Sequence, residues 1–158
     1  MVNPAFDGYE GSQMKIQDIL KVKGDHVETI APDETIRQAM DKIINKRIGA
    51  LIVMEEDNVE GTITERDIAR LIHKDGEKAF AGAVRDTMTR KLIVGLPDDE
   101  VDLAMALMTN NRFRHLPVMN GKRLVGIISI GDIVKAQVKN LEIENRYLID
   151  YIIGKYPA

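Results

Sequence analysis

Apolar and polar residues follow two different periods along this chain, and each period occurs twice. Between residues 34 and 46 the apolar side chains are spaced three and four residues apart, as on one face of an amphipathic helix. Residues 100–111 repeat this spacing. Each helical stretch is followed by two short apolar runs with a polar turn between them, which predicts a β-hairpin, and then by a second helical stretch. The sequence therefore predicts the same helix–strand–strand–helix unit twice, each after a short extended entry.

The predicted strands are residues 49–54, 59–64, 115–119 and 123–129. Asn120 and Gly121 stand between the last two, and both residues tolerate the positive φ angles that tight hairpins need. The helices after the hairpins are predicted over residues 65–73 and 130–139, and a separate terminal helix over residues 141–153. Residues 74–82 are predicted to form a short helix or a loop.

A duplication underlies this pattern. Moving the chain by 65 residues places Gly61 on Gly126 and Asp67 on Asp132 without a gap. A period of this length indicates one supersecondary unit used twice. We expect the two units to pack together about a pseudo-twofold axis, because each hairpin alone would leave one sheet face exposed.

The duplication divides the chain into five predicted segments. They are a loose leader (residues 1–13), a first unit (14–73), a connecting segment (74–83), a second unit (84–139) and a C-terminal helix (140–158). Residues 16–20 resemble residues 84–88 at an offset of 68, so the first unit holds three extra residues near Lys23.

The composition is typical of a globular protein, with 44% hydrophobic and 30% charged residues and a net charge of −3. Opposite charges are interspersed, so no basic stripe indicates nucleic acid, and no apolar run reaches the roughly 18 residues that span a bilayer. The first thirteen residues do not resemble a signal peptide. The chain has no Cys, which excludes disulfides and thiolate catalysis and fits a cytoplasmic protein.

The candidate site is the segment that ends each hairpin and begins the next helix. It reads Gly61-Thr-Ile-Thr-Glu-Arg-Asp67 in the first unit and Gly126-Ile-Ile-Ser-Ile-Gly-Asp132 in the second. Free N–H groups and the dipole at a helix start attract an anion such as phosphate, and a first-turn carboxylate can accept the hydroxyls of a ribose. The alternative is that Thr64 and Asp67 form only a capping box, each satisfying the other's backbone donor.

Catalytic constellations are scarce. The two serines are Ser12 in the leader and Ser129 in the second motif, and no two His residues have metal-ligand spacing. Neither a Walker A segment nor a G-x-G-x-x-G loop occurs. We therefore expect a protein that is not an enzyme, with no metal site and no obligatory cofactor.

These motifs together resemble those of a CBS (cystathionine β-synthase) domain pair, also called a Bateman module. The resemblance rests on V-R-D-x-M at residues 84–88, R-H-L-P-V at residues 114–118 and G-x-[IV]-[ST]-x-x-D in both units, and it covers residues 15–135. It implies an α/β (α+β) fold in which two βαββα-type repeats pack through their sheets. It also implies a regulatory protein that binds AMP, ADP, ATP, NAD or S-adenosylmethionine in clefts between the repeats and signals to a partner protein.

The resemblance also implies roles for individual residues. Sugar or phosphate would contact the polar residues of the two motifs, with the ribose on the aspartates: Thr64, Asp67, Ser129 and Asp132. Adenine would lie against backbone and apolar groups: Thr29, Ile30, Gly49 and Ala50 in the first site, and Ile93 and Val94 in the second. Phosphate would contact basic residues: Arg66, Arg112, Arg114 and His115.

The two sites are not expected to be equal. Arg66 gives the first motif a cation that the second lacks, and Arg114 from the other unit would complete the first cleft. We therefore expect the Asp67 cleft to bind the ligand more tightly. For His115 the alternative is a structural, hydrogen-bonded residue beside an apolar strand.

The resemblance further implies a homodimer, because family members pair through their helices. Leu103 and Leu107 widen the apolar face of the helix in the second unit. The terminal helix either adds to this contact or folds back on its own module. Two other functions stay open, namely a ligand-silent scaffold module and nucleic-acid binding through basic residues: Lys46, Arg47, Arg112 and Arg114.

Overall fold

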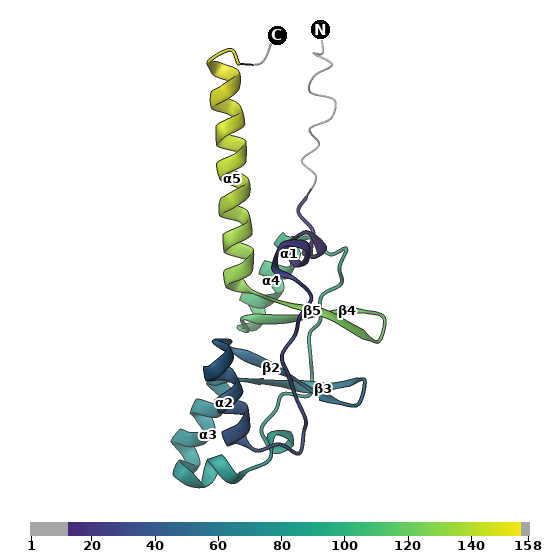
Figure 1. The fold of residues 1–158 in the computed structure, drawn as a ribbon, viewed down its shortest axis with the longest axis vertical. Helices are drawn as coiled ribbons and strands as arrows, with labels where there is room; N and C mark the ends of the chain where they lie inside the picture. The colour runs from purple at the N-terminus through teal and green to yellow at the C-terminus, as the bar shows by residue number, and fades with distance from the viewer. Residues whose placement is uncertain (1–12, 156–158) are drawn as a thin grey trace.

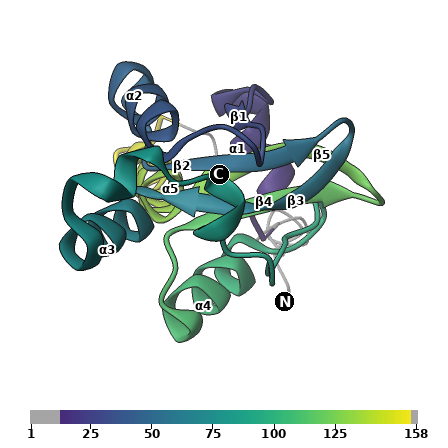
Figure 2. The same ribbon diagram turned by 90° about the horizontal axis from the view of Figure 1, so that it is seen from below.

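The computed structural model describes residues 13–155 of the 158-residue chain, so the predicted leader lies outside the described residues up to residue 12. The fold is of the predicted α/β class: two hairpin layers are stacked in the middle of the molecule, with helices beyond each layer (Figure 1). Viewed along the long axis, the two hairpins overlie each other and their turns lie at the same end (Figure 2).

The first unit contains α1 (Ile16–Lys23), β1 (Thr29–Ile30), α2 (Ile36–Lys46), β2 (Ala50–Glu55), β3 (Asn58–Thr64) and α3 (Glu65–Asp75). Two 3₁₀ helices, η1 (Gly76–Ala81) and η2 (Val84–Asp86), lead into the second unit. That unit contains α4 (Val101–Asn111), β4 (His115–Asn120), β5 (Arg123–Ser129) and α5 (Ile130–Ile152).

The two sheets differ by one strand. In the first unit β1 pairs in parallel with β2, which pairs antiparallel with β3. In the second unit β4 and β5 form an antiparallel pair, and the counterpart of β1 is a single bridge between Gly95 and Val118. Both hairpins carry an irregularity at the same place, after Val53 and after Val118. The 65-residue repeat in the sequence is therefore also a repeat of strand register.

The helix boundaries differ from prediction where a cap decides them. α2 was predicted from residue 34 but begins at Ile36, because the Thr35 hydroxyl accepts a hydrogen bond from the Gln38 amide at 3.2 Å. The Gln38 side chain accepts in return from the Thr35 amide, which completes a capping box.

The C-terminal part of the chain corrects a prediction. Two helices were predicted, over residues 130–139 and 141–153, but the structure has one 23-residue helix, α5. No Gly or Pro stands between Gly131 and Gly154, so nothing in the sequence stops the helix in between. Its far end leads away from the hairpins and does not fold back on them (Figure 1).

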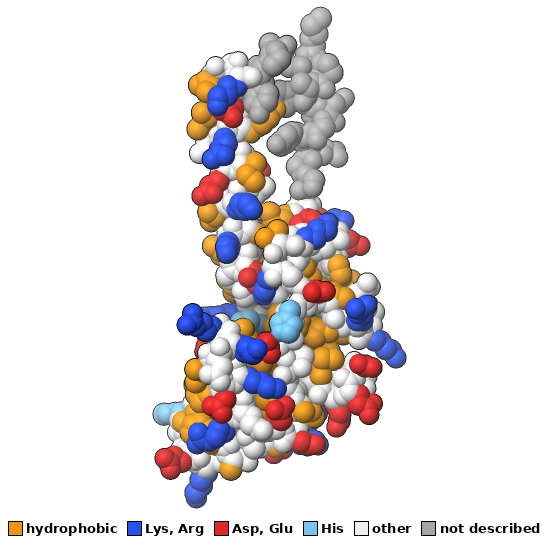
Figure 3. Space-filling model, in the orientation of Figure 1, with side chains coloured by type: hydrophobic (Ala, Val, Ile, Leu, Met, Phe, Trp, Pro, Cys, Tyr) orange, Lys and Arg blue, Asp and Glu red, His pale blue; other side chains and the backbone are white. Residues whose placement is uncertain are grey.

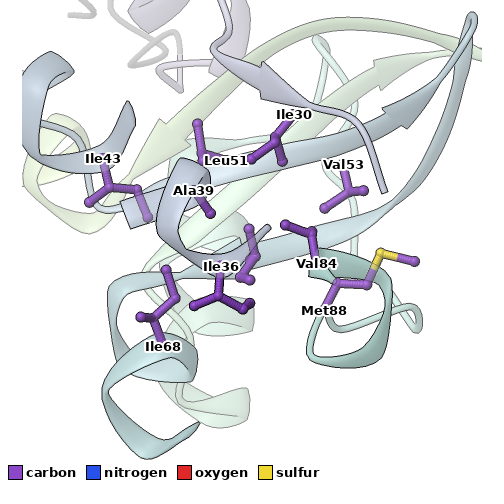
Figure 4. Packing of buried hydrophobic residues seen from close by; sticks show 10 residues of the cluster. Ile30, Ile36, Ala39, Ile43, Leu51, Val53, Ile68, Val84 and Met88 are labelled. Atoms are coloured by element: carbon purple, nitrogen blue, oxygen red, sulfur yellow. The ribbon is translucent and has the colours of Figure 1, made fainter. Parts of the chain in front are cut away.

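The entry segments of the two units lie in each other's cores. α1 contributes Ile16 and Ile19 to the core beneath the second hairpin, whereas Val84 and Met88 belong to the core of the first hairpin (Figure 4). Matching hydrogen bonds fix this arrangement: the Ile16 amide donates to the Asp99 carbonyl, and the Val84 amide donates to the Glu34 carbonyl. Each hairpin is thus covered by an apolar segment from the other sequence unit, while the division of the chain at residues 74–83 stays a prediction.

Two glycines of the repeated motif make this exchange possible. A Cβ atom on Gly61 would lie 2.6 Å from the Thr89 carbonyl oxygen, and one on Gly126 would lie 2.6 Å from Cδ2 of Leu20. Leu20 and Met88 are counterparts at the 68-residue offset, and Met88 is the other close neighbour of Gly61. A side chain at either motif glycine would therefore push away the entry segment that covers the hairpin.

Candidate functional site

A cleft of about 420 Å³ opens beside Asp67, between the two units. Three segments supply most of its wall: residues 64–70 at the start of α3, residues 89–93 after η2, and residues 111–115 between α4 and β4. This volume lies within the range of small-molecule sites. The cleft therefore has walls from both sequence units and room for a nucleotide-sized ligand.

Most residues predicted for the first site meet in this cleft. Its lining includes nine of the predicted residues: Gly49, Ala50, Thr64, Arg66, Asp67, Ile93, Arg112, Arg114 and His115. Ile93 was predicted for the second site but lies here. Thr29 and Ile30 were predicted for this cleft but are not part of its lining, and Ile30 is buried in the first core.

The misplacement of Ile93 has a topological reason. Thr89 is bridged to Thr62 of the first hairpin, and Gly95 is bridged to Val118 of the second. The chain between Thr89 and Gly95 therefore crosses from one layer to the other, along the wall of the Asp67 cleft. In sequence this segment belongs to the second unit, but in space it lines the cleft beside the motif of the first unit.

The Asp67 carboxylate takes part in a capping box. Its Oδ2 accepts from the Thr64 amide at 2.9 Å and from the Thr64 hydroxyl at 2.8 Å, and the Asp67 amide donates to that hydroxyl at 3.2 Å. The alternative foreseen from the sequence is thus present, but it engages only one carboxylate oxygen. Among residues 13–155, nothing contacts Oδ1 within hydrogen-bonding distance.

Basic side chains dominate the charge of the cleft. Its lining holds two acidic residues, Glu65 and Asp67, and five basic ones: Arg66, Arg70, Lys91, Arg112 and Arg114. The sequence reasoning missed two of these cations. Arg70 stands one helical turn after Arg66, so helical spacing alone could have found it, whereas Lys91 reaches the cleft only through the layer crossing. In a chain of net charge −3, this local excess favours an anionic ligand.

His115 lies between the Asp67 cleft and the second motif. Its ring packs on Gly49, where an added Cβ atom would come within 2.8 Å of Cε1 of the imidazole. Burial lowers the pKa of His115 below its ordinary value, and the positive charge of Lys23 lowers it further. The imidazole is therefore neutral at pH 7, so that it can offer phosphate a hydrogen bond but no positive charge.

The second motif has a different set of contacts. Asp132 Oδ2 accepts from the Ser129 amide at 2.8 Å, as in the first capping box, but it also accepts from Lys23 Nζ at 2.6 Å. The same ammonium donates to the Ile127 carbonyl at 2.8 Å. Burial opposes ionisation of Asp132, yet the bonds from Lys23 and Ser129 outweigh it, and the pKa of this carboxyl lies below its ordinary value. The sequence reasoning did not find this ion pair.

Two negative findings concern residues 13–155. Within that range no group of three or more acidic or His side chains is arranged to hold a metal ion. None of the helices there combines the length and the apolar character needed to cross a membrane.

Comparison with known proteins identifies the family. The model of the CBS domain matches residues 17–74 and again residues 84–139. The chain belongs to the CBS domain family, and the two matches make it a CBS pair. Pairs of this kind are regulatory modules.

Relatives and solved structures agree with this assignment. The mitochondrial CBS domain-containing protein CBSX3 of Arabidopsis thaliana is 37% identical over 94% of this chain and 76% of its own length. The crystal structure of ATU1752 from Agrobacterium tumefaciens is 37% identical and superposes with a TM-score of 0.78 over 82% of this chain and 97% of that one. The CBS pair of protein MJ0100, solved with 5′-methylthioadenosine and S-adenosyl-L-methionine, is 25% identical with a TM-score of 0.72, covering 81% of this chain and 98% of that chain.

Proposed function

We propose that this protein binds one phosphorylated adenosine compound, such as AMP, ADP, ATP or NAD, in the Asp67 cleft and relays its occupancy to a partner protein. One observation carries the proposal: in a cleft of nucleotide size, a carboxylate with one oxygen that accepts no hydrogen bond from residues 13–155 stands beside five cations. Adenosyl ligands in the related MJ0100 pair support the class of compound.

Each part of the ligand has a matching part of the cleft. Asp67 Oδ1 accepts the ribose hydroxyls, since a carboxylate oxygen is a strong acceptor for such donors. Ile93 and Ala50 offer apolar contact to the adenine. Arg66 and Arg114, from different units, bind the phosphates from both sides.

The charge of the cleft selects among adenosine compounds. A phosphate chain is stabilised by the five cations, whereas 5′-methylthioadenosine is uncharged and the sulfonium of S-adenosylmethionine is positive. We therefore expect affinity to rise with the negative charge of the ligand and to fall with added salt.

Signalling follows from the position of the cleft between units. A ligand held by α3 on one side and by the α4–β4 junction on the other stabilises one relative arrangement of the two hairpins. Binding shifts the population towards that arrangement, and a partner that prefers it binds more tightly. The expected homodimer would carry this change across two modules.

A ligand panel followed by thermal unfolding tests the proposal. AMP, ATP and NAD at 100 times their Kd should each stabilise the protein by about 2.7 kcal/mol. At equal concentration, adenosine and 5′-methylthioadenosine should shift the midpoint less, because they lack phosphate. GMP controls for the base. If no phosphorylated adenosine compound shifts the midpoint at millimolar concentration, the proposal is wrong and the ligand-silent scaffold is favoured.

A further inference from the structure

We propose that Lys23 takes the place of a ligand at Asp132, so that the chain has one nucleotide site and not two. This inference rests on the function proposed for the Asp67 cleft and concerns the matching position in the second unit. There the ammonium of Lys23 lies against the second motif and places a positive charge on its carboxylate: it donates to Asp132 Oδ2 at 2.6 Å and to the Ile127 carbonyl at 2.8 Å.

The last turn of α1 brings Lys23 to this position. α1 ends at Lys23, and the Gly24 amide closes the helix by donating to the Leu20 carbonyl at 2.8 Å. Leu20, one turn earlier, packs on Gly126, which anchors the helix beside the second motif. Gly24 then takes a φ of 95°, and the chain turns away through the extra residues of the first unit.

The counterpart of Lys23 behaves differently. Lys91 matches Lys23 at the 68-residue offset and lines the Asp67 cleft, but among the described residues it makes no ion pair with Asp67. Lys91 does not end an α-helix as Lys23 does: the element before it is the 3₁₀ helix η2, which ends at Asp86. One lysine therefore remains available to a ligand, while the other neutralises its own carboxylate.

Two further replacements remove nucleotide-binding groups from the second position. At the 65-residue offset Glu28 stands where the Asp67 cleft has Ile93, and Gly131 stands where it has Arg66. The Glu28 carboxylate is held by His26 at 2.8 Å and by Lys46 at 3.4 Å. At the second position a charged Glu28 thus stands in place of the apolar contact for adenine. Gly131, which has no side chain, stands in place of the Arg66 contact for phosphate.

The first test counts ligands. Isothermal calorimetry with AMP should give one site per wild-type chain, and Asp132→Asn should keep that site with unchanged affinity. Asp67→Asn should lose it. Two sites in the wild type, or a halved stoichiometry in Asp132→Asn, would overturn the inference.

The second test needs no nucleotide, so it separates this inference from the proposed function. The pKa of the Asp132 carboxyl is followed by NMR in ligand-free wild type and in Lys23→Met, with Lys91→Met as the matched control. Lys23→Met should raise this pKa and Lys91→Met should leave it unchanged. An unchanged Asp132 titration in Lys23→Met would overturn the Lys23 contact even if AMP binds at Asp67. Absence of AMP binding together with a raised pKa would overturn the proposed function and the one-site count, but not the Lys23–Asp132 contact.

An independent observation concerns the exposed side of α5. Apolar side chains lie at the surface along this helix as it leaves the hairpin layers (Figure 3). Five of them and Asn145 form one row with alternating spacings of four and three residues: Val134, Val138, Leu141, Asn145, Leu148 and Ile152. Its apolar members are 47–80% exposed. We call this row the α5 seam.

The α5 seam has the residue types of a two-stranded coiled coil. A strict four–three spacing is a heptad repeat, in which Val138, Asn145 and Ile152 occupy the a positions and the Val134, Leu141 and Leu148 side chains occupy d. β-branched residues at a with Leu at d favour parallel dimers. A single Asn at a favours the same state, because two Asn side chains in one layer can hydrogen-bond to each other.

Charges beside the α5 seam favour the parallel orientation. Glu142 and Glu144 flank it on either side. If two helices paired antiparallel with full overlap, Glu142 would face Glu142 of the other copy and Glu144 would face Glu144. Asn145 would then face Leu141. In a parallel pair, Glu144 faces the apolar Ile149, so this repulsion is absent. The geometry points to a second copy of this chain, aligned in parallel, as the occupant of the α5 seam.

Two variants of nearly equal exposure test this interface. Leu148 lies in the seam and is 57% exposed, whereas Ile143 lies outside it and is 58% exposed. In sedimentation experiments Leu148→Glu should convert a dimer to a monomer, and Ile143→Glu should leave the dimer intact. A monomeric wild type at micromolar concentration, or a dimer that survives Leu148→Glu, would overturn the inference.

The absence of Cys from the chain allows a test of orientation. Asn145→Cys should form a disulfide-linked dimer under mild oxidation, since parallel helices bring both copies of an a position into one layer. An antiparallel pair, a membrane-bound helix or a different protein partner would leave Asn145→Cys without this crosslink, and each result would contradict the parallel pair.

Discussion

The two copies of the G-x-[IV]-[ST]-x-x-D motif have nearly the same local structure but different charged neighbours. Both form a capping box at a helix start. Within residues 13–155 the hydrogen bonds to both carboxylates fall on Oδ2, but Asp67 makes no ion pair in its open cleft, whereas Asp132 is paired with Lys23 at 2.6 Å. The difference comes from the segment that crosses each motif, residues 89–93 in one case and α1 in the other. The two motifs therefore share their local fold and differ in the charge that the passing segment places beside the carboxylate.

The largest expected effect distinguishes the two aspartates. Asp67→Ala should weaken AMP binding about 100-fold, since it removes the hydrogen bonds that the ribose hydroxyls donate to a charged acceptor, worth about 3 kcal/mol together. Asp132→Ala should leave AMP affinity within twofold of the wild type. Calorimetry measures both affinities. Equal losses in the two variants would contradict the expected difference between Asp67 and Asp132.

The two motif glycines give the next effect, on stability. Gly61→Ala should lower the free energy of unfolding by about 2–3 kcal/mol, because its Cβ would meet the Thr89 carbonyl, which belongs to the backbone and cannot rotate away. Gly126→Ala should cost about 1 kcal/mol, since the flexible end of Leu20 can move. Urea unfolding of both variants checks the order, and the reverse order would contradict the account of the two entry segments.

Substitution of the two lysines should have smaller effects: loss of Lys23 should affect stability, and loss of Lys91 should affect AMP binding. Lys23→Met should lower the free energy of unfolding by about 0.5–1 kcal/mol, since the ion pair is partly exposed, and should leave AMP affinity unchanged. Lys91→Met should leave stability unchanged and weaken AMP binding by roughly threefold, as expected for one exposed cation near phosphate. Unfolding and binding measured on both variants decide whether the lysines differ in this way.

The smallest effect is a pH dependence from His115. Its lowered pKa means that the folded protein binds this proton less readily than the unfolded chain does. The free energy of unfolding should therefore be highest above pH 6.5, the ordinary value for His, and should fall as the pH drops below it. In His115→Gln this fall should be smaller. Unfolding midpoints between pH 7.5 and 5.5 test the difference, and parallel curves would show that His115 is not responsible.

The sequence by itself determined the repeat, both hairpins and the capped motifs, because these depend on residues close together in the chain. Spacing of apolar residues predicted α2 and α4. Thr64, Arg66 and Asp67 of the first motif lie in one cleft with Arg114 and His115, while their role as a site stays a prediction. The continuous α5 was within reach of the same reasoning, since no Gly or Pro interrupts residues 132–153.

Only the tertiary structure decided which segment lies beside which motif. α1 packs on the second hairpin, η2 and Met88 pack on the first, and the crossing segments move Ile93 and Lys91 to the Asp67 cleft. Lys23 and Asp132 are 109 residues apart, and no local pattern signals their contact. Such contacts arise because the two units bury their sheets by exchanging apolar entry segments. The energy of this exchange depends on how the complete fold packs, so it cannot be estimated from either unit alone.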